Sequence, residues 1–210
     1  MTSPATWYFD VISPFAYLSL PGLRRLGAHR PIVMKPVLFA GLLNHWGQLG
    51  PAEIAPKRRH IYRQTVFMAE RLGLPCRLPP THPFRPLAIL RLLTALGASE
   101  AAVTAAFRLV WGEGRDPNDP AVLADVAQEG NDPGAVERID SPAIKQALAD
   151  ATAAAIAAGV FGVPTLAIDD ELFWGLDALP MAEAYLADPA LFGTGEYARL
   201  DTIAASARRR

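Results

Sequence analysis

The spacing of apolar residues differs between the two ends of the chain and its middle. Residues 6–12 and 32–39 have the composition of strands, and apolar residues at helical spacing run from Phe15 to about Gly27 between them. The order strand, helix, strand predicts a parallel βαβ unit at the start of the chain.

The middle of the chain, from about residue 40 to residue 158, is mainly helical in its pattern. Short segments rich in proline and glycine interrupt it, as is typical of turns between helices. The predicted helices cover residues 54–73, 86–96, 99–112, 120–128 and 142–158.

The last part of the chain returns to strands. Residues 163–169 and 171–174 flank a tight turn at Asp169-Asp170, which predicts a hairpin, and a helix over about residues 177–187 follows. A βαβ unit, a helical block, two strands and a final helix is the element order of a thioredoxin fold with an insertion. The pattern therefore predicts an α/β protein with a thioredoxin fold that carries a large all-helical insertion.

Length and composition agree with one core that accommodates such an insertion. The chain has 210 residues, of which 51% are hydrophobic, and this is enough to bury a sizeable core. The insertion must return the chain to the sheet that it left. We therefore expect residues 1–39 and 159–210 to form the thioredoxin-like domain and residues 40–158 to form the helical insertion domain.

Charge and cysteine content narrow the possible functions. The formal net charge of −1 provides no basic field for nucleic acid or a membrane surface, and without a run of about 18 apolar residues we expect no transmembrane helix. We also expect no signal peptide and no metal site. The single cysteine, Cys76, excludes a disulfide within the chain and fits a reducing cytoplasm. The C-terminal residues 207–210 are expected to form a solvated tail.

The Ser13-Pro14 pair stands where the first predicted strand passes into the first predicted helix. Serine is a good helix N-cap, and proline suits the first helical position. Thioredoxin folds place their reactive group at this point, where the helix N-terminus favours a thiolate. Residues 13–16 contain no cysteine, which excludes dithiol redox chemistry, and no nearby histidine suggests a general base for Ser13. Ser13 then either donates a hydrogen bond to a thiolate that a ligand supplies, or only caps the helix.

The Val163-Pro164 pair is the second candidate. Thioredoxin-like proteins carry a cis-proline before the third strand, opposite the helix N-terminus, and Pro164 occupies that place in the chain. The residue before such a proline can offer its backbone to an extended peptide, which binds as an added strand. The alternative is an ordinary turn proline.

Several stretches of the chain together carry a family resemblance. They are YFDVISPFAYL, LLNHWGQLGPAEIAPKRRHIYR, VWGEGRDPND, GVFGVPTL and FWGLDAL, and they run from near residue 7 to near residue 180. In these stretches the chain resembles the 2-hydroxychromene-2-carboxylate isomerases. These enzymes are relatives of the kappa-class glutathione transferases in the DsbA-like branch of the thioredoxin superfamily.

The resemblance implies glutathione as the cofactor. Ser13 would be the catalytic residue and would hold the glutathione sulfur as a thiolate, while Val163 would pair its backbone with the cysteinyl part of the tripeptide. Asp177 would pair with the γ-glutamyl ammonium group, or serve as a helix N-cap. The family often carries an arginine after this aspartate, where this chain has Ala178. The implied cofactor-binding residues are Ser13, Val163, Pro164, Trp174, Gly175, Leu176 and Asp177.

The resemblance also implies the reaction and its setting. The thiolate would add to a conjugated carbon of a small aromatic carboxylate, the former double bond would rotate, and elimination would return the thiol in a cytoplasmic homodimer. The implied substrate-binding residues are Asn44, Trp46, Gln48, Phe84 and Arg85. Phe15, Tyr17 and Trp111 are further candidates for the aromatic walls of the pocket, and each of these aromatic residues has a place in the core as its alternative.

The chain departs from the family where a cation is expected. Characterised isomerases carry a substrate-contacting lysine in the loop after the second strand, where this chain has Leu43 and Asn44, and the nearest lysine is Lys57. Arg85 stands where an asparagine is frequent and offers a replacement cation; it is otherwise a surface residue. The cluster 57–60 is expected on an exposed helix face, from which one member reaches the site at most. Two other functions stay open: a kappa-like glutathione transferase that conjugates an electrophile, and a non-catalytic thioredoxin-like binding module.

Overall fold

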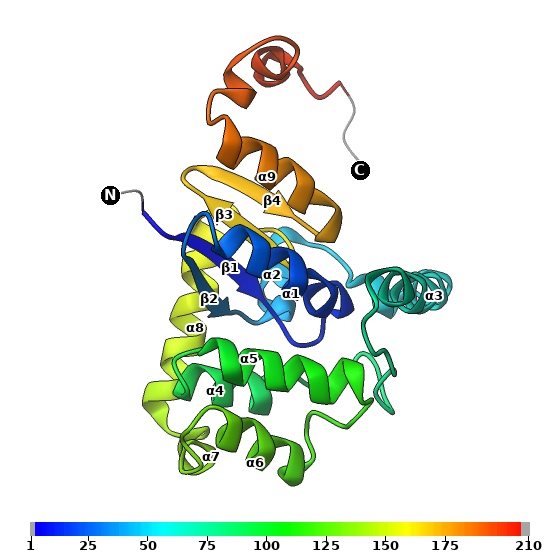
Figure 1. Cartoon of the computed structure of the whole chain (residues 1–210), viewed down its shortest axis with the longest axis vertical. Helices are drawn as coiled ribbons and strands as arrows, with labels where there is room; N and C mark the ends of the chain where they lie inside the picture. The colour runs from blue at the N-terminus through cyan, green and yellow to red at the C-terminus, as the bar shows by residue number, and fades with distance from the viewer. Residues whose placement is uncertain (1–2, 207–210) are drawn as a thin grey trace.

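A four-stranded sheet forms the centre of the computed structural model, which describes residues 3–206 (Figure 1). The strand order is β2-β1-β3-β4, and β1 pairs in parallel with β2 and antiparallel with β3. Trp7 lies opposite Met34 on one side and Leu166 on the other. The strands are β1 (Ala5–Phe9), β2 (Ile32–Pro36), β3 (Thr165–Ile168) and β4 (Glu171–Trp174).

Helices cover both faces of this sheet. On one face α1 (Pro14–Gly27) connects β1 to β2 and packs against α9 (Leu179–Ala187). The close approach depends on Gly22, because a Cβ at this position would lie 2.6 Å from Cδ1 of Leu179. On the other face, α2 (Phe39–Trp46) and α8 (Pro142–Ala157) enclose a smaller apolar cluster with the 160–163 loop.

The remaining helices form the insertion between α2 and α8. Figure 1 shows α4 to α7 at one end of the molecule and α9 with the C-terminal turns at the other, with the sheet between them. The last helical turn before Glu113 is a π-helix, Arg108–Gly112. The insertion helices are α3 (Ala55–Leu72), α4 (Leu87–Ala95), α5 (Glu100–Phe107), α6 (Pro120–Glu129) and α7 (Ala135–Arg138).

Short 3-10 turns complete the element order. They are η1 (Pro51–Glu53), η3 (Leu176–Ala178), η4 (Leu191–Gly193) and η5 (Tyr197–Thr202). Within residues 3–206, no helix combines the length and apolar composition that crossing a membrane requires. The residues 207–210, expected to form a solvated tail, lie outside the described part of the chain.

The predicted fold class is confirmed, and the differences lie at the ends of elements and in two short helices, α2 and α7, that the pattern did not predict. The first two strands were expected to reach residues 12 and 39, but they end at Phe9 and Pro36. The chain turns at Asp10 to enter α1, while α2 begins at Phe39. The division into two domains stays a prediction.

One apolar core joins the sheet to the insertion. Trp7 and Phe9 of β1 stack on each other with ring centroids 4.6 Å apart, and Phe107 of α5 packs against both at 6.0 and 5.7 Å. All three side chains are almost completely buried. Since aromatic side chains bury a large apolar area, this contact contributes to the stability of both parts.

An ion pair between buried Arg30 and half-exposed Asp169 joins the segment after α1 to the hairpin. Arg30 is 8% exposed, and its guanidinium donates to the Asp169 carboxylate at 3.0 and 2.5 Å and to the Ser3 carbonyl at 2.7 Å. The Arg30 guanidinium lowers the pKa of Asp169 below its usual value. Asp169 has a φ of 54°, a conformation that aspartate and asparagine adopt more readily than most residues.

Replacing Phe107 tests the joined core. Phe107→Ala is expected to lower the free energy of unfolding by about 3–5 kcal/mol, the usual range for truncating a buried phenylalanine. Chemical denaturation measures this change, and unfolding should stay a single transition because the rest of the apolar core still joins both parts. Phe67→Ala on α3, where the side chain is 55% exposed, is the matched control and should change stability little.

Candidate active site

Ser13 stands at the N-terminus of α1 and faces the loop before β3. Its Oγ accepts a hydrogen bond from the Ala16 amide at 3.3 Å and donates to the Val163 carbonyl at 3.4 Å, across 150 residues of sequence. The side chain is 7% exposed. The Val163-Pro164 bond is cis, as the sequence predicts for a proline at this position. The hydroxyl therefore caps the helix and also meets the second predicted site element.

The 162–165 segment leaves part of its backbone available. Within residues 3–206 the Val163 amide makes no hydrogen bond, and the carbonyl accepts only the Ser13 hydroxyl. Neighbouring backbone carbonyls are paired. The Pro164 carbonyl accepts from the Gly175 amide at 2.8 Å, and the Gly162 carbonyl accepts from the Thr165 hydroxyl at 2.7 Å. An edge of free peptide groups is what an extended peptide needs in order to bind as an added strand.

Residues 174–177 lie beside this segment. The indole of Trp174 covers Gly162, where a Cβ would come within 2.5 Å of Nε1, and it packs against Phe161 with ring centroids 5.2 Å apart. Gly175 has a φ of 92°, and a Cβ there would meet the Asp177 carboxylate at 2.6 Å. Asp177 is exposed and forms no ion pair within residues 3–206. An exposed carboxylate with no ion pair among the described residues thus follows the tryptophan that packs against the loop before β3.

Comparison with known proteins places this geometry in a family. The model of the DSBA-like thioredoxin domain matches residues 6–187. The chain belongs to the DsbA-like thioredoxin family. It is 35% identical over 200 residues to the 2-hydroxychromene-2-carboxylate isomerase of Sphingobium xenophagum, an alignment that covers 90% of this chain and 100% of that protein. The predicted membership of the 2-hydroxychromene-2-carboxylate isomerase family is thereby confirmed.

One further sequence relative and one solved structure are similar to this DsbA-like chain over most of its length. Glutathione S-transferase kappa 2 of Caenorhabditis elegans is 29% identical over 209 residues, covering 87% of this chain and 91% of that protein. The solved structure of a 2-hydroxychromene-2-carboxylate isomerase superposes with a TM-score of 0.74 at 26% identity, over 95% of this chain and 98% of the other.

Asp10 is a site residue of this DsbA-like chain that the sequence did not reveal. Its carboxylate is fully buried and accepts hydrogen bonds from the Ile12 amide at 3.0 Å and the Phe39 amide at 2.9 Å. The second bond caps α2, whose Leu38 N-cap has no side-chain bond of its own. Burial raises the pKa of Asp10 to about 7, and the two amide donors oppose part of that shift. A lone acid after an apolar strand was the only local signal for it.

The insertion supplies donors to the same turn. The Trp111 indole donates to the Val11 carbonyl at 2.7 Å, and Nε2 of His82 lies 2.9 Å from the Ile12 carbonyl. The sequence suggested no histidine near Ser13, because His82 is far along the chain and lies in a proline-rich segment without periodicity. The structure places its imidazole against the carbonyl of Ile12, the residue directly before Ser13.

The predicted substrate residues occupy different surroundings. Asn44 and Gln48 are exposed at the end of α2, and Trp46, 44% exposed, donates through its indole to the Val160 carbonyl at 3.0 Å. Phe84 belongs to the core, 8% exposed, whereas Arg85 is exposed and makes no ion pair within the described residues. Their contact with a substrate stays a prediction.

The aromatic candidates on the Ser13 side of the molecule are mainly core residues. Trp111 is completely buried, and Tyr17 is buried with its hydroxyl donating to the Pro75 carbonyl at 2.7 Å. Phe15 is half-buried. In the 57–60 cluster, Arg58 alone is half-buried while the others are exposed, as expected for that helix face. Across residues 3–206, no three acidic, histidine or cysteine side chains gather as a metal site would require.

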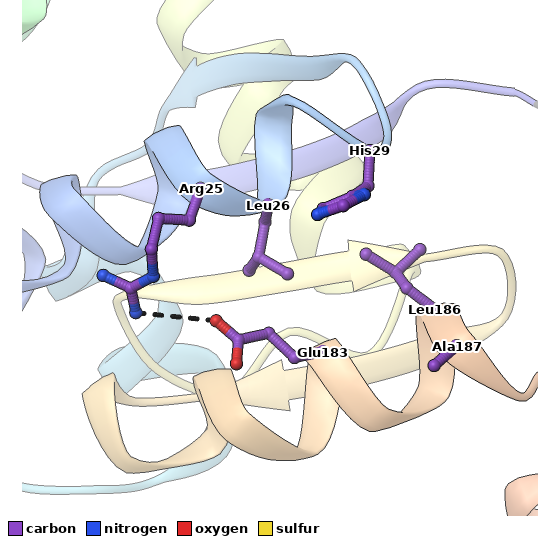
Figure 2. A pocket seen from close by; sticks show the side chains of 6 residues that line it. All are labelled: Arg25, Leu26, His29, Glu183, Leu186 and Ala187. Carbon is purple, nitrogen blue, oxygen red and sulfur yellow. Dashed lines mark hydrogen bonds and ion pairs between the residues drawn. The ribbon is translucent and has the colours of Figure 1, made fainter.

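A separate hollow of about 400 Å³ lies between the C-terminal half of α1 and α9 (Figure 2). Arg25 and Glu183 face each other across it, 3.5 Å apart, with His29 and Leu186 at its other end. Since each helical residue advances about 1.5 Å, its walls on α1 begin roughly 18 Å along the helix from Ser13. It contains none of the predicted site residues and plays no part in the candidate site.

Asp10 makes stability depend on pH in a defined direction. A carboxyl with a raised pKa binds its proton more tightly in the folded than in the unfolded chain, so its contribution is largest below about pH 4 and falls until about pH 7. We expect the unfolding free energy of the wild type to fall over that window relative to Asp10→Asn, by at most about 1.4 kcal/mol per pH unit. Denaturation in urea at a series of pH values measures the difference.

Asp169→Asn is the control of opposite sign for this experiment. Arg30 depresses the pKa of Asp169, so this carboxylate contributes stability above about pH 4 and loses it as the pH falls further. Asparagine keeps the backbone conformation that residue 169 requires. Parallel pH profiles for the wild type and Asp10→Asn would show that Asp10 does not titrate in this window.

Proposed function

We propose that this chain is a glutathione-dependent cis–trans isomerase of the 2-hydroxychromene-2-carboxylate isomerase type. The observation that supports this most is the serine hydroxyl at the N-terminus of α1, directly opposite the cis Val163-Pro164 bond, in a turn without cysteine. The named isomerase relative at 35% identity, which aligns over its whole length, supports the same reaction class.

The free groups around Ser13 fit a tripeptide thiol. Within the described part of the chain the Val163 amide is unpaired, the Val163 carbonyl accepts only the Ser13 hydroxyl at the N-terminus of α1, and the Asp177 carboxylate follows residues 174–176. The peptide backbone of the ligand would pair with Val163, its sulfur with Ser13 and its ammonium group with Asp177. Glutathione, when bound, supplies the thiolate that adds reversibly to a conjugated carbon, so that the former double bond can rotate.

The residues of the chain have separate tasks in this scheme. Ser13 donates its hydrogen bond to the sulfur, in exchange for the long 3.4 Å bond to Val163, and thereby favours the thiolate. The positive end of α1 adds to this effect. Val163, Pro164 and the 174–177 segment orient the tripeptide, so that its sulfur stays at the helix terminus.

The substrate is proposed to be a small aromatic carboxylate. Arg85 is the exposed cation next to the core residue Phe84, and a guanidinium can bind a carboxylate through two parallel hydrogen bonds. Asn44 and Trp46 on α2, with Gln48 just after it, would line the side of the pocket near the 160–163 loop, to which the Trp46 indole is hydrogen-bonded. The cytoplasm as location and a homodimer as assembly belong to the same proposal.

A kappa-like glutathione transferase is the second candidate, favoured by the Caenorhabditis elegans relative. Both enzymes would use the same thiolate, and they differ in whether the adduct reverts or leaves. Incubation of 2-hydroxychromene-2-carboxylate with the protein should yield an isomer of unchanged mass, and only when glutathione is present. A stable product heavier by glutathione would favour the transferase, and no turnover together with glutathione binding would favour a binding module.

Ser13→Ala tests the role of the hydroxyl. The ultraviolet thiolate absorbance of the glutathione complex should titrate below the free thiol value of about 8.5 in the wild type and closer to that value in the variant. Turnover near neutral pH should fall and partly recover at higher pH, because the thiolate then forms without help. Glutathione affinity should change much less.

Ser141→Ala is the matched control for the loss of a helix cap. Ser141 caps α8 through the Ile144 amide and is also followed by proline, but it lies far from the site. Both variants should lose about 1 kcal/mol of stability. Coincident thiolate titrations of the wild type and Ser13→Ala would mean that Ser13 serves only as a cap.

A further inference from the structure

We propose that His82 is a positioning residue for Ser13, because its imidazole holds the Ile12–Ser13 peptide group from the insertion side. The inference rests on the proposed function for its catalytic consequence, while the structural part stands on contacts alone. His82 lies in the segment between α3 and α4, about 70 residues away along the chain from the turn that it contacts.

The Ile12–Ser13 peptide is held at both of its polar atoms. Its carbonyl oxygen lies 2.9 Å from Nε2 of His82, and its N–H donates to the Asp10 carbonyl at 3.0 Å. A peptide group is planar, so two bonds at opposite ends fix its orientation as a unit. Cα of Ser13 belongs to this plane, so the orientation of the plane fixes the point from which the Ser13 side chain starts. Loss of either bond would free the plane to rotate and move the hydroxyl.

The preceding peptide group is held from the same side. The Trp111 indole donates to the Val11 carbonyl at 2.7 Å, while the Ile12 amide at the other end of that peptide donates to the Asp10 carboxylate at 3.0 Å. Two side chains of the insertion therefore hold two consecutive carbonyls of the turn. Asp10 holds the two N–H groups from the thioredoxin side. The turn that presents Ser13 is thus built by both parts of the chain.

The surroundings of His82 define its tautomer. A carbonyl oxygen can only accept, so Nε2 carries the hydrogen and Nδ1 is left as an acceptor in the neutral ring. The Tyr62 hydroxyl of α3 lies 3.1 Å from Nδ1 and 2.8 Å from the His82 carbonyl. The ring packs edge-on against Trp111 and Phe84, with centroids 5.3 and 5.8 Å away.

The charge state of His82 follows from the groups that face it. Burial lowers its pKa, the bond to the Ile12 carbonyl opposes this, and the Arg58 guanidinium on α3 lowers it further. Tyr62 is the other titratable group against the ring, and burial raises its own pKa. Trp111, Phe84 and the Ile12 carbonyl carry no charge. The neutral ring with a hydrogen on Nε2 is accordingly the form that holds the turn near neutral pH.

His82→Leu and His82→Gln separate the hydrogen bond from packing. Leucine fills apolar space without a donor, whereas the glutamine amide can place an N–H close to the position of Nε2. In His82→Leu we expect amide hydrogen exchange of residues 10–16 to be at least tenfold faster than in the wild type, turnover to fall at least tenfold, and the bound thiol to titrate at higher pH. His82→Gln should restore most of each property, and Tyr62→Phe should give an intermediate result.

His60→Leu is the control, because this histidine is exposed on α3. It should leave all three measurements unchanged. Equal exchange in the 10–16 segment for the wild type and a folded His82→Leu would overturn the inference, as would equal defects in His82→Leu and His82→Gln. The exchange experiment needs no glutathione. If the wild type shows no thiolate signal with glutathione, the proposed function fails, and the exchange rates still decide whether His82 holds the turn.

Discussion

Antiparallel pairing of β1 with β3 is the constraint on which the candidate site depends. Tyr8 lies opposite Thr165, so the residues that follow β1 meet the residues that precede β3 at the same edge of the sheet. The first group contains Ser13 and the second contains Val163. The hydrogen bond from the Ser13 hydroxyl to the Val163 carbonyl joins the two groups at the site. Because β1 also pairs in parallel with β2, α1 must leave from this edge, and its N-terminus points to the same place.

The insertion contributes to the site through its core and through two polar contacts. Phe107 joins it to β1 in the apolar interior, and beyond that contact Trp111 and His82 reach the turn before α1. A turn with several buried polar groups needs partners for each of them. In this chain the partners come from Asp10 itself, from His82 in the segment before α4 and from Trp111 in the π-turn after α5. The helical part therefore holds the turn that presents Ser13, in addition to covering the sheet.

Much of the fold could be predicted from the sequence, because strands, caps and prolines act locally. Ser13-Pro14 and Val163-Pro164 were visible as pairs, and the family resemblance indicated that they face each other. Asp10 and His82 were not visible, because their bonds join residues 29 and 70 positions apart and follow no periodicity. Trp111 was recognised only as a candidate aromatic wall of the pocket. The hydrogen bond from its indole N–H to the Val11 carbonyl, which links it to the turn before α1, was not visible in the sequence. The short helix α2 was missed because the carboxylate that caps it belongs to Asp10, 29 residues earlier in the turn after β1.

The π-helical turn Arg108–Gly112 has a consequence for the evolution of this chain. Such turns contain one residue more per turn than an α-helix and are frequent at functional sites. Trp111 lies inside this turn, because the helix ends at Gly112, so the direction of its indole depends on the wide geometry of the turn. A single-residue deletion that converted the turn to α-helix would change the angular spacing of the residues within it and would disturb the hydrogen bond from Trp111 to the Val11 carbonyl. We therefore expect an insertion or deletion in this segment to be less tolerated than a substitution at its exposed positions.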